Sequence, residues 1–193
     1  MSPELRNLPN VLSLSRIPMS LAFVSLYTNT DKALFWACLA IVAAALLTDV
    51  LDGHVARKLN VTSETGYFLD GLGDKAFTVA IILVISRQDP DHIAIYWVLI
   101  TREIVLYALR ALDKRRRENI KKLRLLSLLQ AFFIRVFFLG FFIEEVLLLN
   151  KIYAHDLFSH YSIFAYLSGI VGCLSIIILS RYIISQELER VST

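Results

Sequence analysis

Four aspartates carry the chemistry that this sequence offers: Asp49, Asp52, Asp70 and Asp74, within TDVLDGHVARKLNVTSETGYFLDGLGDK. Residues three or four apart share one face of a helix, so the spacing predicts two acidic faces on consecutive helices. Ionised carboxylates are costly in apolar helices and usually have a function there. Close together they repel one another, and one or two divalent cations would relieve that repulsion. Oxygen ligands without histidine or cysteine favour Mg²⁺ or Mn²⁺, with two ions expected.

Small residues lie on the same two faces as the carboxylates. Gly53, Ala56 and Gly66 would let two helices approach closely, or leave space for a flat ligand beside the backbone. Arg57 adds a cation at the end of the same stripe. Metal ions, small residues and an arginine together suit a substrate that contains a diphosphate.

Two other interpretations of the aspartates have to be weighed. A single aspartate could be a buried partner of Lys75 or Arg57, but four on two matched faces are hard to explain as structural pairs. The carboxylates could instead coordinate an ion in transit through a channel or transporter. Their position near one end of the helices, not at mid-membrane, argues against transport.

The elements that must position these residues are membrane helices. The chain has 193 residues, of which 56% are hydrophobic, and this is too apolar for a soluble domain of that length. We expect an all-α membrane protein with a single domain over residues 1–193. Apolar runs approaching the length of a bilayer span predict six transmembrane helices. Their expected bounds are Val11–Tyr27, Ala33–Ala56, Gly66–Ser86, Ile93–Leu112, Leu123–Leu149 and Tyr161–Ser185.

The distribution of basic residues predicts the orientation of these helices. Most lysines and arginines outside the apolar runs fall on one side of the expected topology, including the run Lys114 to Arg117. Cytoplasmic loops carry this excess, so both termini and the four aspartates are expected on the cytoplasmic side. Nucleic-acid binding by the basic run is not supported, because no soluble domain accompanies it. Attraction to anionic lipid is the simpler explanation. The chain is compatible with a bacterial inner membrane protein.

The fixed positions read Asp49-x2-Asp52-Gly53-x2-Ala56-Arg57-x8-Gly66-x3-Asp70-x3-Asp74, which resembles the motif of the CDP-alcohol phosphotransferases at every fixed position. Two further segments resemble phosphatidylglycerophosphate and cardiolipin synthases of that family. They are Pro9-Asn10 with Arg16, and Thr101-Arg102-Glu103 followed by Leu109-Arg110. Gly71 and Gly73 stand where those enzymes commonly have proline and alanine.

The resemblance implies a reaction and a role for each motif residue. An acceptor hydroxyl would attack the lipid-bearing phosphorus of CDP-diacylglycerol, and CMP would leave. Asp49, Asp52 and Asp70 would bind metal, and Asp74 would be the general base while also touching a metal. Asp49 and Asp52 would also contact the CDP group. The small residues and the arginine of the stripe, Gly53, Ala56, Arg57 and Gly66, would line the cytidine and phosphate pocket. Family members are commonly homodimers, so a homodimer is expected.

Several alcohols are candidates for the acceptor. Glycerol 3-phosphate comes first, and its phosphate would need basic partners. The candidates are Arg16, Arg102, Arg110, Lys122 and Arg124. The alternatives are a cardiolipin synthase that uses phosphatidylglycerol, and an enzyme with an inositol phosphate or another polyol as its acceptor. A metal-ion transporter or an inactive binding module would be a different class of protein.

Overall fold

The structure is a computed structural model that describes residues 3–28, 31–58, 64–113, 119, 121–152 and 157–191. Within these ranges, the side chains of residues 3–9, 49, 50, 52–58, 64, 65, 67, 157–159, 187 and 189–191 lie outside the description. The described residues form six α-helices and one short 3₁₀-helix, with no strand among them. This confirms the prediction of an all-α protein.

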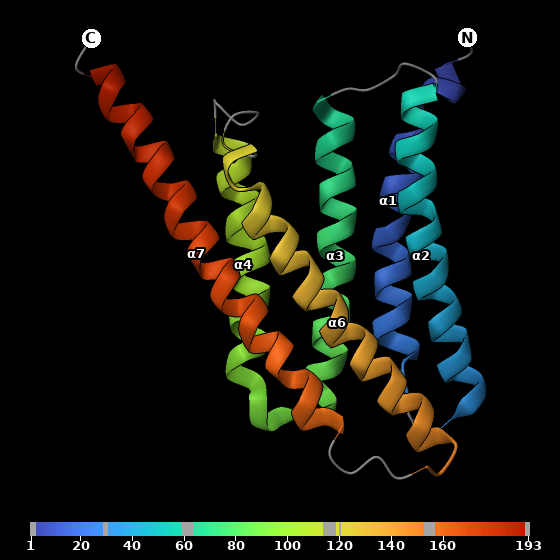
Figure 1. The fold of residues 1–193 in the computed structure, drawn as a ribbon. Coiled ribbons are helices and arrows are strands. Elements are labelled where there is room, and N and C mark those ends of the chain that lie inside the picture. The colour runs from blue at the N-terminus through green and yellow to red at the C-terminus, as the bar shows by residue number, and fades with distance from the viewer. Residues whose placement is uncertain are drawn as a thin grey trace. The chain divides into compact units, whose positions relative to one another are not determined.

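Figure 1 labels the helices, which belong to two compact units that are described separately. The first unit, Met1–Gln88, holds α1 (Pro3–Leu26), α2 (Lys32–Lys58) and α3 (Glu64–Gln88). The second unit, Asp89–Thr193, holds η1 (Pro90–His92), α4 (Ile93–Leu112), α6 (Arg124–Leu149) and α7 (Leu157–Val191).

In the first unit, α1 is the central element and packs along both α2 and α3, which have little contact with each other. Aromatic rings join the helices away from the acidic motif: Phe23 lies 5.8 Å from Phe77, and Tyr27 lies 6.1 Å from Phe35, between ring centroids. The helix α2 begins where Asp31 caps it, since its carboxylate accepts the backbone N–H of Ala33 at 2.8 Å. In the first unit, α1 therefore lies between the two helices that carry the motif.

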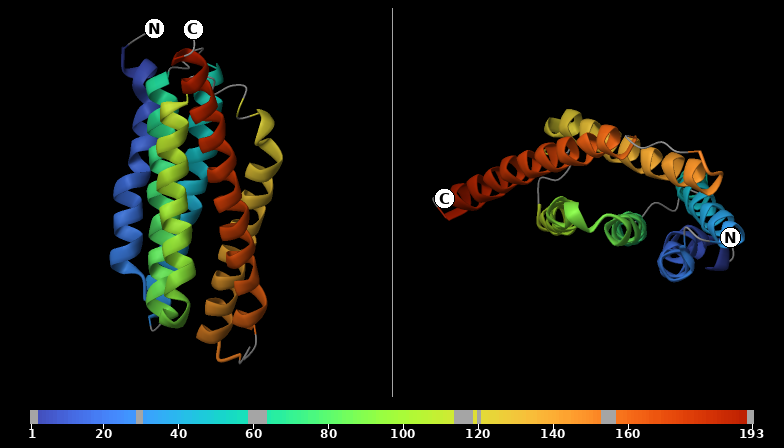
Figure 2. Two further views of the ribbon diagram at one scale, coloured as in Figure 1. Left: turned by 90° about the vertical axis from the view of Figure 1, so that its left-hand side faces the viewer. Right: turned by 90° about the horizontal axis from the view of Figure 1, so that it is seen from below.

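In the second unit, α7 packs along both α6 and α4, and Figure 2 shows α6 and α7 running antiparallel. Phe137 joins the three helices, because its ring centroid lies 6.2 Å from that of Tyr96 and 5.9 Å from that of Tyr161. Where this unit begins, Asp89 accepts a hydrogen bond of 2.6 Å from the Tyr96 hydroxyl.

Three of the described helices are long and apolar enough to cross a membrane: Pro90–Leu112, Arg124–Leu149 and His160–Gln186. Two shorter apolar stretches, Asn10–Leu26 and Lys32–Thr48, lie in the first unit. Three of the six predicted spans thus have the length and composition that a membrane crossing needs, and the six-span topology stays a prediction. The helices themselves run longer than expected at α1, which begins at Pro3, and at α7, which continues to Val191.

Candidate functional site

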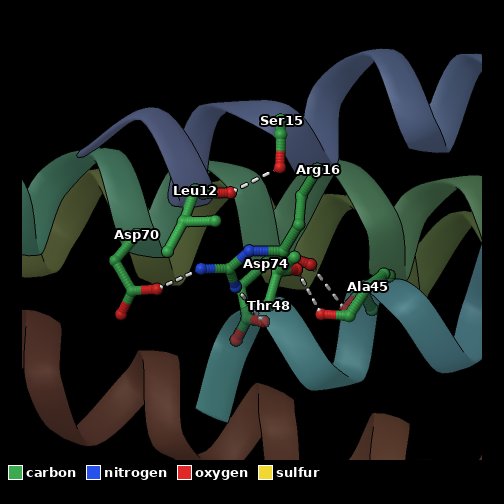
Figure 3. A network of polar contacts seen from close by, with 8 residues as sticks. Leu12, Ser15, Arg16, Ala45, Thr48, Asp70 and Asp74 are labelled. Atoms are coloured by element: carbon green, nitrogen blue, oxygen red, sulfur yellow. Dashed lines mark hydrogen bonds and ion pairs between the residues drawn. The ribbon is translucent and has the colours of Figure 1, made fainter. Parts of the chain in front are cut away.

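Asp70 and Asp74 lie one turn apart on α3, and both meet the same arginine from α1 (Figure 3). Arg16 places Nη2 2.5 Å from Oδ1 of Asp70 and Nη1 3.2 Å from Oδ1 of Asp74. The arginine side chain is 1% exposed, whereas the two carboxylates are 45% and 59% exposed. The structure therefore confirms that these two aspartates share a face of α3. It also shows that the buried guanidinium of Arg16 contacts both of them.

The pattern of buried residues on α1 explains how Arg16 reaches α3. Ser13, Arg16, Ser20 and Phe23 are all buried, and their spacing of three or four residues defines one face of the helix. This face lies against α3 so closely that a Cβ added to Gly73 would come within 2.4 Å of the Ser13 carbonyl oxygen. Glycine is needed at this position for the two backbones to approach so closely.

The other half of the motif belongs to α2. The helix runs through Asp49, Asp52, Gly53, Ala56 and Arg57, but their side chains lie outside the described residues. On the turn of α2 that precedes Asp49, the Thr48 hydroxyl donates a hydrogen bond of 2.8 Å to the Ala45 carbonyl oxygen (Figure 3). The convergence of all four carboxylates therefore stays a prediction.

The first residue of the α3 stripe is Gly66, which is partly buried one turn before Asp70. Positions 66, 70 and 74 are four residues apart, so they follow one face of α3 as the sequence predicts. Gly66 therefore leaves that face without a side chain on the turn that precedes the two carboxylates.

The chemistry of the described donors fits a hard divalent cation. Asp70 and Asp74 present carboxylate oxygens, which Mg²⁺ and Mn²⁺ prefer. Among the side chains that the structure describes, no three of histidine, cysteine, aspartate and glutamate gather as a metal site. That search does not include Asp49 and Asp52, whose side chains would have to complete the set.

The predicted acceptor residue Arg102 lies in a buried polar cluster of the second unit. It forms an ion pair with Glu103, and both side chains are 3% exposed. Gln130 of α6 donates to Glu103 at 3.2 Å and lies 3.5 Å from the Ser168 hydroxyl of α7. The cluster thus joins α4, α6 and α7 through side chains that are costly to bury alone.

Sequence reasoning missed most of this cluster. Gln130 and Ser168 could have indicated a buried polar cluster, because each is a polar residue inside a long apolar run. Gly172 of α7 completes the arrangement, since a Cβ there would come within 2.6 Å of Arg102 Nε.

The remaining acceptor candidates lie where α4 ends and α6 begins. Arg110 donates from Nη2 to the Ser127 hydroxyl at 3.1 Å. Lys122 holds its Nζ 5.0 Å from the ring centroid of Tyr182 on α7, a cation–π distance. Arg124 is exposed at the first residue of α6. Arg110, Lys122 and Arg124 therefore belong to one region of the second unit, while Arg16 belongs to the first.

Comparison with known proteins gives several similar enzymes. The CDP-diacylglycerol–glycerol-3-phosphate 3-phosphatidyltransferase of Blochmanniella floridana is 34% identical over 113 residues, covering 54% of this chain and 56% of the relative. The enzyme of the same name from Aquifex aeolicus is 38% identical over 105 residues, 52% of this chain and 56% of the relative. The CMP-forming cardiolipin synthase of Oryza sativa is 34% identical over 119 residues, 56% of this chain and 36% of the relative.

These alignments span little more than half the length of the bacterial relatives. No solved structure is significantly similar to the chain. The match to the family model is more extensive, because the model named CDP-alcohol phosphatidyltransferase aligns with residues 6–173. That range includes α1 from residue 6 onward, with Arg16, and the complete motif from Asp49 to Asp74. The chain therefore belongs to the CDP-alcohol phosphatidyltransferase family.

Proposed function

We propose that this protein transfers a phosphatidyl group from CDP-diacylglycerol to glycerol 3-phosphate, releasing CMP, with divalent metal ions. The observation that carries the proposal is the pair of exposed carboxylates, Asp70 and Asp74, side by side within a complete family motif. The names of the bacterial relatives, which are glycerol-3-phosphate 3-phosphatidyltransferases, support this choice of substrates.

The bond changes follow from the substrates. The hydroxyl oxygen of glycerol 3-phosphate attacks the phosphorus that carries diacylglycerol, and the bond from that phosphorus to the CMP oxygen breaks. Asp74 takes the hydroxyl proton. A carboxylate is a weak base for an alcohol, so accurate positioning has to share the work.

The metal ligands in this proposal are Asp49, Asp52 and Asp70, with Asp74 also within reach of an ion. Two Mg²⁺ or Mn²⁺ ions, when bound, would neutralise the diphosphate and stabilise the departing CMP. Gly53, Ala56, Arg57 and Gly66 would leave room for the cytidine and phosphates. The partial exposure of Asp70 and Asp74 is consistent with a role as ligands.

The phosphate of the acceptor is assigned to Arg110, Lys122 and Arg124. Lys122 and Arg124 are exposed. Arg16 and Arg102 were also candidates, but each is buried against carboxylates, which leaves a phosphate little access. The assignment therefore narrows the expected set to three residues.

The membrane setting completes the proposal. The excess of basic residues on one side supports an orientation with both termini and the active site facing the cytoplasm. The bacterial origin of several relatives supports the bacterial inner membrane as its location. The lipid chains of CDP-diacylglycerol would remain in the bilayer. A homodimer is proposed from family resemblance alone.

The experiment is a CMP-release assay on the purified full chain in detergent with CDP-diacylglycerol and Mg²⁺. Glycerol 3-phosphate, phosphatidylglycerol, inositol, inositol phosphate and serine are supplied one at a time, and chelation of Mg²⁺ by EDTA serves as the metal control. Release with glycerol 3-phosphate, lost in EDTA, is the expected result. Silence with every acceptor, in folded protein, would favour a binding module, and cation flux in sealed vesicles without CDP-lipid would favour a transporter.

A second candidate is a cardiolipin synthase that uses phosphatidylglycerol. The similarity to the rice enzyme favours it, and the reaction chemistry would be the same. Release of CMP with phosphatidylglycerol but not with glycerol 3-phosphate would select this alternative.

A further inference from the structure

We propose that Arg16 is a positioning residue, which fixes the Asp70 and Asp74 carboxylates so that they can hold a divalent cation. The close contact between α1 and α3 at Gly73 would set its position. The inference rests on the proposed function of the two aspartates as cation ligands.

The geometry of the contact supports this role. One planar guanidinium meets two carboxylates on consecutive turns of α3, with different nitrogens, at 2.5 Å and 3.2 Å (Figure 3). A guanidinium presents its donors in a rigid fork, whereas the ammonium of lysine is a point charge on a flexible stem. Arg16 can therefore restrict the rotation of both carboxylates at once, and lysine at this position would not reproduce the arrangement.

The pattern of exposure shows which side of the carboxylates remains accessible. Arg16 is 1% exposed and contacts Oδ1 of each aspartate, while the two carboxylates are about half exposed. Among the described residues, the polar contact of Asp70 uses Oδ1 alone. A cation can thus approach from the exposed side without displacing the arginine.

The backbone contact at Gly73 explains why Arg16 stays in this place. Alanine at Gly73 would bring its Cβ within 2.4 Å of the Ser13 carbonyl oxygen and 3.4 Å of the Arg16 Cβ. The clash is with backbone, so α1 and α3 would have to separate. Separation would draw the guanidinium away from the carboxylates, although Arg16 itself would be unchanged.

A simple structural clamp between two helices is the competing explanation, and the chain supplies a control for it. Arg87 of α3 donates from Nη1 to the Val24 carbonyl of α1 at 3.2 Å, so it also joins these two helices. Gly71 supplies the control for a glycine-to-alanine change, because it is two residues from Gly73 and thus on nearly the opposite side of α3.

The experiment measures Mn²⁺ binding to the full chain in detergent, by the electron paramagnetic resonance signal of free Mn²⁺, without CDP-lipid. Arg16→Lys keeps the charge, so a change in affinity reports the geometry. We expect Arg16→Lys and Gly73→Ala each to raise the Kd for Mn²⁺ by about tenfold or more, as loss of an outer hydrogen-bond partner usually does. Arg87→Lys and Gly71→Ala should keep the wild-type Kd.

Unchanged Mn²⁺ affinity in Arg16→Lys would overturn the inference, as would an equal loss in Arg87→Lys or a wild-type protein that binds no Mn²⁺. If Arg16→Lys does not fold, Gly73→Ala decides, because it retains the arginine. CMP release is measured on the same samples. Wild-type protein that binds Mn²⁺ but releases no CMP would refute the proposed transfer, and the Kd values would still decide the role of Arg16.

Discussion

Arg102 lies directly across Gly172, so that a Cβ at Gly172 would come within 2.6 Å of the arginine Nε and 2.7 Å of its Cγ. The arginine cannot move aside easily, because it is buried and paired with Glu103. The glycine on α7 thus provides the space in which a charged residue of α4 is accommodated.

Gly172→Ala should therefore destabilise the second unit by about 1–3 kcal/mol, the usual cost of overpacking. Denaturant unfolding in detergent measures it. Gly169→Ala is the matched control on the same helix, because its added Cβ would meet Ile95 Cδ1 at 2.9 Å, the end of a flexible side chain. Equal stability of the Gly172 and Gly169 variants would contradict the importance of the Arg102 contact.

Glu103→Gln should be more severe, because it leaves the Arg102 guanidinium buried without its counter-charge. Breaking a buried pair in this way costs about 3–5 kcal/mol. The double variant Arg102→Leu with Glu103→Leu should recover much of the loss, since it removes both buried charges of the pair. The free energies of unfolding of the variants form the test, and a double variant less stable than Glu103→Gln would contradict the argument.

The sequence predicted the helices well and the site in part, and the reasons are physical. The bounds of α4 match the prediction because charged or polar residues limit the apolar run at both ends. The shared face of Asp70 and Asp74 follows from helical spacing alone. The partner of these aspartates did not follow, because Arg16 is 54 and 58 positions away from them in the sequence. Spacing within one helix carries no information about packing between helices. Gly73 was visible as a departure from the family pattern, but its closeness to the Ser13 carbonyl needed coordinates.

Substitution of the exposed basic residues should separate acceptor binding from chemistry. In Lys122→Gln and Arg124→Gln the KM for glycerol 3-phosphate should rise, by about tenfold for each lost charge-assisted contact, with little change in kcat. Lys151→Gln, an exposed lysine after α6, is the control. A fall in kcat at unchanged KM would show that these residues do not serve the acceptor phosphate.

Asp70→Asn should raise the Mg²⁺ concentration needed for half-maximal CMP release, because an amide oxygen is a weaker cation ligand than a carboxylate. Asp91→Asn, an exposed aspartate in η1, is the matched control. The Mg²⁺ titration of initial rates is the measurement. A wild-type titration curve for Asp70→Asn would remove this residue from the metal site.

Asp74→Asn should differ from Asp70→Asn in kind, because the proposal makes Asp74 the acceptor of the hydroxyl proton. An amide cannot take that proton, so CMP release should fall by about 10²-fold or more, and added Mg²⁺ should not restore it. Binding of CDP-diacylglycerol, measured separately by retention of the labelled donor on the detergent-solubilised protein, should persist. Donor binding lost together with turnover would indicate that Asp74 serves the site as a ligand alone, and rescue by excess Mg²⁺ would lead to the same conclusion. Retained binding with lost turnover would instead assign the proton transfer to Asp74, one helical turn from the Asp70 carboxylate that shares its arginine.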